Sequence, residues 1–108
     1  CATSLGSWWD GRHIGHHGLV CCVSAQSGAA FSTGVGGFVA TDDVGIAARV
    51  AAMAGCYDRN FKRQFAAPES SVFRDIDQGR YPNYSLPMSN IVAAVLRSQI
   101  AALAPRLR

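Results

Sequence analysis

Apolar and polar residues follow a helical period through the middle of the chain. From Thr41 onward, apolar side chains recur every three or four positions and arginines lie between them. Thr41 is a suitable N-cap, and Asp42 and Asp43 fall in the first turn, where carboxylates stabilise the positive end of a helix. We therefore predict an amphipathic helix over Thr41–Phe65. Its predicted core face consists of Ile46, Val50, Met53, Tyr57, Phe61 and Phe65.

A second helical pattern lies near the end of the chain. Ser89 or Asn90 can cap it, and Pro105 ends it. Gln99 falls within its apolar arc, and Arg97 lies on the other side. The arc consists of Val92, Val95, Leu96, Ile100 and Leu103.

The first forty residues have the shorter periods of strands and turns. Gly18–Val23 is apolar on both faces, as in a covered central strand. A turn over Ser24–Gly28 would return the chain as a second strand over Ala29–Thr33, while Asp10 and Gly11 read as another turn. The predicted fold class is α+β: a small antiparallel sheet packed against two α-helices, in a single domain over residues 1–108.

Glycines mark two further places. Gly34, Gly36 and Gly37 favour a tight turn or bulge, and the alternative is a backbone cradle for an anion. The spacing matches neither the dinucleotide fingerprint nor the phosphate-binding P-loop. Gly55, inside the first predicted helix, indicates close approach of another part of the backbone.

Composition narrows the function classes. The net charge of +3 comes from nine arginines and one lysine, which are scattered, so no nucleic-acid partner is predicted. The apolar runs fall well short of the ~20 residues of a membrane-spanning helix. Carboxylates are few and form no evident acid–base pair, so we lean against an enzyme and expect no cofactor.

Cysteine stands at position 1. Cys1 followed by small and polar residues resembles the start of mature bacterial lipoproteins, in which this cysteine carries lipid. The leading hypothesis is therefore a small exported, lipid-anchored protein of the bacterial envelope that binds a protein partner or joins an envelope assembly. Its expected location is periplasmic or membrane-anchored in the bacterial envelope.

The alternative hypothesis makes Cys1 a catalytic nucleophile. Autoproteolysis can expose a cysteine whose thiol attacks an amide and whose α-amine acts as the base. The predicted order of strands and helices is loosely similar to the first half of the N-terminal-nucleophile hydrolase fold. Such folds need further strands after the second helix, which this chain lacks, and no oxyanion-hole residues stand out.

The other cysteines are candidates for a disulfide. Cys21 and Cys22 are adjacent and point to opposite faces of a strand, so at most one of them pairs with Cys56. Buried, reduced thiols are the alternative.

Three histidines and two adjacent tryptophans are the remaining candidate site residues. His13, His16 and His17 form a weak metal-site alternative, because their spacing matches no standard ligand set; a solvated loop is favoured and no metal is expected. Trp8 and Trp9 either cover the core, which we favour, or lie at an interface with a partner or membrane.

Overall fold

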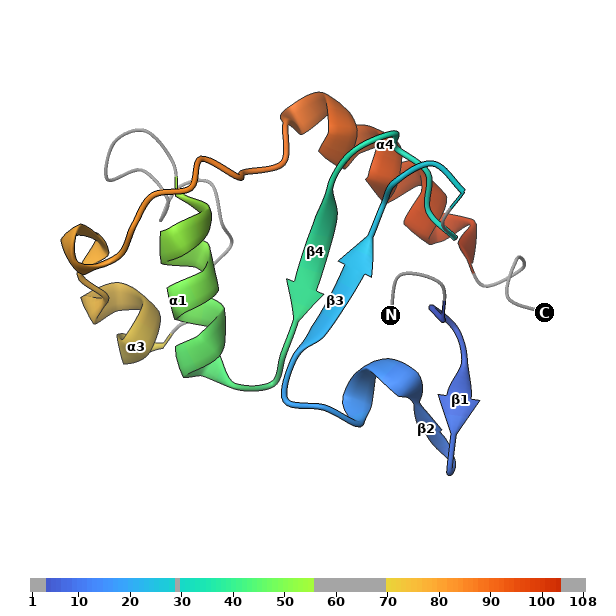
Figure 1. The fold of residues 1–108 in the computed structure, drawn as a ribbon, viewed down its shortest axis with the longest axis horizontal. Helices are drawn as coiled ribbons and strands as arrows, with labels where there is room; N and C mark the ends of the chain where they lie inside the picture. The colour runs from blue at the N-terminus through green and yellow to red at the C-terminus, as the bar shows by residue number, and fades with distance from the viewer. Residues whose placement is uncertain (1–3, 29, 56–69, 104–108) are drawn as a thin grey trace. The chain divides into compact units, whose positions relative to one another are not determined.

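The computed structural model describes residues 4–28, 30–55 and 70–103. Two small antiparallel sheets and several helices confirm the α+β class (Figure 1). The chain forms two compact units, Cys1–Ala40 with Met88–Arg108 and Thr41–Pro87, which are described separately below. The single domain over residues 1–108 stays a prediction. The described helices are too short and insufficiently apolar to cross a membrane.

The first unit begins with the hairpin of β1 (Trp8–Trp9) and β2 (Arg12–His13). Its turn residues, Asp10 and Gly11, have φ values of 46° and 71°. Two positive φ angles in succession are the pattern of a type I′ turn, which suits a two-residue hairpin. The predicted turn at Asp10 and Gly11 is therefore confirmed.

A second ribbon is formed by β3 (Cys21–Ser24) and β4 (Gly37–Ala40), drawn as paired arrows in Figure 1. Cys21 faces Ala40 and Ser24 faces Gly37 across this ribbon. The predicted hairpin exists, but its return strand is not Ala29–Thr33. The chain needs a longer connection before β4, because Ala25 lies in the core and Thr33 turns back to bond to it.

The core of this unit lies between β3 and the helix α4 (Asn90–Ala101). Ser89 is the N-cap, since its hydroxyl accepts from the Val92 N–H at 3.3 Å. Leu96 is the buried residue of α4, whereas Val95 and Ile100 of the predicted arc are exposed. The buried cluster is Cys21, Val23, Ala25, Phe31 and Leu96, with Leu5, Met88 and Leu103 packed against it.

The second unit is organised by α1 (Val44–Ala54). Its N-cap is Asp43, whose carboxylate accepts from the Ile46 N–H at 2.8 Å, and not the predicted Thr41. The Thr41 hydroxyl instead accepts from the Asp43 N–H at 3.1 Å. The helix ends at Gly55 with φ of 73°, and the predicted continuation over residues 56–65 lies outside the described residues.

The buried face of α1 is made of small residues. Ala48, Ala51 and Ala52 are buried, whereas the predicted core residue Met53 is half-buried. Ala48 and Ala51 pack with Phe73 of the short helix α3 (Ser71–Asp75). Small side chains allow the close approach that the predicted face of larger residues would prevent.

Gly55 lies against the segment that follows α3, as the sequence predicted. A side chain at Gly55 would collide with the amide of Asn83. The N–H groups of Tyr84 and Leu86 donate to the carbonyls of Met53 and Ala54, at 3.0 and 2.7 Å. The last turn of α1 is therefore satisfied by a distant segment, which explains a helix end without a charged residue.

Candidate functional site

The connection between β3 and β4, residues 25–36, of which Ala29 is not described, is held by hydrogen bonds at several points along its backbone. It opens with Ala25, whose N–H donates to the Gly36 carbonyl at 3.0 Å. The Ala25 carbonyl then accepts from the Thr33 N–H at 2.9 Å. These bonds join both ends of the connection to one fully buried residue.

The hydroxyl groups of Ser24 and Thr33 form hydrogen bonds to the backbone of the connection. The Thr33 hydroxyl lies 2.7 Å from the Val35 carbonyl and 3.1 Å from the Ala25 carbonyl, and it can donate its single proton to one of them at a time. The Ser24 hydroxyl accepts from the Gln26 N–H at 3.2 Å. These groups bond to the backbone, so they shape the loop and are not arranged as a nucleophile with its base.

Helix α4 clamps the same connection through Gln99. The Gln99 carbonyl oxygen accepts from the Ser32 N–H at 2.7 Å, and its amide nitrogen donates to the Ser32 carbonyl at 2.7 Å. One side chain thus satisfies both backbone groups of Ser32, as a neighbouring strand would. The sequence placed Gln99 within the apolar arc but gave no sign of its partner.

The glycine run has a structural role. Gly34 and Gly36 have φ of 81° and 108°, which a side chain disfavours. A Cβ on Gly37 would lie 2.5 Å from the Val23 carbonyl oxygen. The run leads into β4 and not into a helix, and the Asp43 carboxylate already occupies the N-terminus of α1. The predicted turn or bulge fits this geometry better than an anion cradle.

The three histidines lie near one another without forming a ligand set. The rings of His13 and His16 are 6.0 Å apart, and the His17 ring bonds to the Trp9 carbonyl at 2.9 Å. Both ring nitrogens of His13 face backbone N–H groups, those of Gly6 and Gly15, at 3.0 and 3.1 Å. A neutral imidazole can accept at only one nitrogen, so one of these bonds forms at a time. Within the described ranges, no three His, Cys, Asp or Glu residues cluster as a metal site.

Cys21 is buried and Cys22 is exposed, and both are free thiols. The disulfide hypothesis is therefore wrong for these two residues, and the alternative of a buried, reduced thiol describes Cys21. The two thiols lie on opposite faces of β3. Cys56, its proposed partner, and Cys1 lie outside the described residues.

Trp8 and Trp9 are each 69% exposed, so the favoured core interpretation is wrong. They lie in a two-residue strand whose hairpin is too small to bury them. Trp8 makes an edge contact with His13, with ring centroids 6.1 Å apart.

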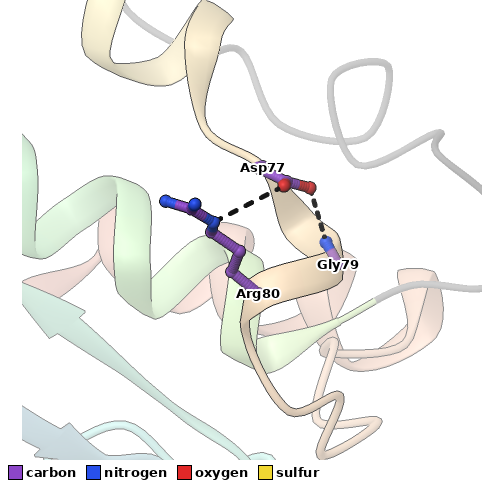
Figure 2. Close-up of polar contacts among 3 residues, drawn as sticks. All are labelled: Asp77, Gly79 and Arg80. Carbon is purple, nitrogen blue, oxygen red and sulfur yellow. Dashed lines mark hydrogen bonds and ion pairs between the residues drawn. The ribbon is translucent and has the colours of Figure 1, made fainter.

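The polar contacts of Asp77 are made with its close neighbours along the chain. Figure 2 shows its carboxylate between the Gly79 N–H, which donates at 3.0 Å, and the Arg80 guanidinium, whose Nε lies 3.9 Å away. Both charged side chains are largely exposed. The contacts cap the short 3-10 helix Gln78–Arg80, and an exposed pair of this kind contributes little to stability.

Comparison with known protein families gives a match. The family model described as the DegT/DnrJ/EryC1/StrS aminotransferase family matches residues 1–107. No curated protein and no solved structure matches the chain significantly.

This match contradicts both predicted functions. An aminotransferase family does not fit a lipid-anchored envelope protein, nor an amidohydrolase with Cys1 as nucleophile. The family match also contradicts the predicted envelope partner and lipid anchor. A cysteine followed by small residues is too short a pattern to identify a lipid site. The envelope location stays a prediction. Because the family model matches residues 1–107, the chain belongs to the DegT/DnrJ/EryC1/StrS aminotransferase family.

Proposed function

We propose that the protein transfers amino groups between an amino donor and a carbonyl acceptor with pyridoxal phosphate. The observation that carries this proposal is the family match over residues 1–107. Pyridoxal phosphate supplies the electron sink for chemistry at the carbon that bears the amine. The proposal replaces the earlier leaning against an enzyme and the expectation of no cofactor.

The described residues do not fit the covalent site of this cofactor. Pyridoxal enzymes hold the aldehyde on a lysine amine and place an Asp or Arg at the ring nitrogen. No lysine lies within residues 4–28, 30–55 and 70–103; the chain's one lysine, Lys62, is outside these ranges. No step of the reaction is therefore assigned to the described residues.

Their geometry instead supports a framework role within the proposed enzyme. The β3–β4 connection is held by Ala25, Thr33 and Gln99, and its backbone is set by glycines with positive φ. A connection with this many internal bonds loses little conformational freedom when a neighbouring group contacts it. We assign it the role of a rigid support.

The test is amino transfer by the full-length protein. The purified protein is incubated with pyridoxal phosphate and a panel of L-amino acids, and keto-acid products are measured by mass spectrometry. A keto acid that accumulates catalytically after an aldehyde or ketone acceptor is added supports the proposal. The matched control omits pyridoxal phosphate. Failure of every donor to yield a keto acid, with folded protein and cofactor present, contradicts it.

A further inference from the structure

The described part of the chain lacks the amine that a Schiff base requires. The cationic side chains of its described residues are all arginines. A guanidinium remains protonated in proteins, so it is no nucleophile for an aldehyde. The described histidines have no primary amine.

The acidic partner of the cofactor's ring nitrogen is missing as well. No charged side chain is buried among the described residues. Their five aspartates are exposed, and two of these already cap helices: Asp43 caps α1, and Asp77 caps the Gln78–Arg80 helix. The attraction between a carboxylate and the protonated ring nitrogen of the cofactor is stronger where water is excluded, so a buried carboxylate suits this role. The described ranges thus contain no lysine, and each of their Asp and Arg side chains is exposed.

Lys62 remains, and its sequence neighbours favour a different role. Arg63 is its direct neighbour and Arg59 lies three positions before it, and clustered basic residues are typical of a solvated face. An anchoring lysine needs a site enclosed enough to hold the cofactor against it. The sequence pattern around Lys62 does not indicate one.

We infer that pyridoxal phosphate is not attached covalently to any of residues 1–108. This inference rests on the proposed function, since it concerns how that function's cofactor is held. This stretch of the protein supports the reaction without providing its Schiff base.

The experiment traps any Schiff base on the full-length protein. The protein is mixed with one equivalent of pyridoxal phosphate and reduced with sodium borohydride, which converts the imine into a stable secondary amine. After digestion, mass spectrometry locates the pyridoxyl group. Protein unfolded in urea and treated with excess pyridoxal phosphate is the positive control, because excess aldehyde labels any lysine and the labelled Lys62 peptide must then be detected.

We expect no pyridoxyl group on any peptide from residues 1–108 of the folded protein. The variant Lys62→Arg, which keeps the charge but removes the primary amine, should bind pyridoxal phosphate with unchanged affinity. A pyridoxyl group on Lys62, lost in Lys62→Arg together with cofactor affinity, overturns the inference. That result leaves amino transfer itself intact, whereas absence of keto acid contradicts the proposed function whatever the peptide map shows.

Discussion

Gly34 in the β3–β4 connection and Gly37 at the start of β4 are favoured over other residues for different physical reasons. Gly34 has φ of 81° but open space around the position of a Cβ. Gly37 has no such φ, but a Cβ there would lie 2.5 Å from the Val23 carbonyl oxygen. One position is restricted by backbone conformation and the other by crowding against a fixed strand.

Substitution by alanine and by asparagine should distinguish the restriction by backbone conformation at Gly34 from the crowding at Gly37. Gly34→Ala should cost about 1–2 kcal/mol of unfolding free energy, and Gly34→Asn less, because asparagine tolerates positive φ. Gly37→Ala should cost about 1–3 kcal/mol through crowding, and Gly37→Asn at least as much. Urea unfolding of the four variants measures this. Rescue by asparagine at position 37 would contradict the steric account.

Gln99 is the residue whose side chain joins α4 to the connection. Gln99→Leu should lower the unfolding free energy by about 1–2 kcal/mol, because two hydrogen bonds to Ser32 are lost. Ser32→Ala is the matched control: the clamp uses only the Ser32 backbone, so the hydroxyl is dispensable. Chemical denaturation compares the two. Equal losses in both variants would show that the clamp does not act through the backbone.

At the scale of elements, the buried face of α1 differs from the face that the sequence predicted. The period of larger apolar residues placed Met53 in the core, whereas the close packing of α3 selects alanines. Both stripes run along the same helix, so periodicity alone could not choose between them. The choice depends on Phe73, which lies in an element that the sequence did not predict.

Charge substitutions on α1 should reveal which stripe is buried. Ala48→Asp should destabilise the protein by about 3–5 kcal/mol, because an unpaired carboxylate would enter a fully buried position. Met53→Asp should cost less, about 1–2 kcal/mol, since Met53 is half-buried and its charge can reach water. Thermal melts followed by circular dichroism measure both. A larger loss for Met53→Asp would restore the originally predicted face.

At the scale of the whole molecule, hydrogen exchange should distinguish packed elements from the small hairpin. Amides of the β3–β4 ladder and of α1 near Ala48 should exchange slowly, because opening them exposes buried side chains. Amides of the β1–β2 hairpin should exchange quickly, since its strands have two residues each. Exchange resolved by NMR measures both groups. Slow exchange at Trp8 and Trp9 would indicate that something covers this hairpin.

Function was the least predictable property at this scale. The feature of the sequence that bears most on the cofactor is that only one of its ten Lys and Arg residues is a lysine. That count became informative only after the family match suggested an amine-dependent cofactor. Both predicted functions were based on Cys1, because a terminal cysteine suits lipid attachment and also nucleophilic catalysis. The residue type at one position is too little information to identify a function.

The sequence by itself determined the features that depend on neighbours along the chain. It predicted the α+β class, the turn at Asp10 and Gly11, and a helix cap at Ser89 or Asn90. Gly55 within a helical pattern also indicated a close approach, but not which segment approaches. Caps and tight turns are set by a few consecutive residues, because their hydrogen bonds span only two or three positions.

Only the tertiary structure decided which segments meet. It moved the return strand to Gly37–Ala40, selected the alanine face of α1, and brought Gln99 to Ser32 across 67 positions. It also left Trp8 and Trp9 exposed, against the general tendency of tryptophan to be buried. These outcomes depend on which surfaces fit together in space, and a local pattern contains no information about a partner that lies far away along the chain.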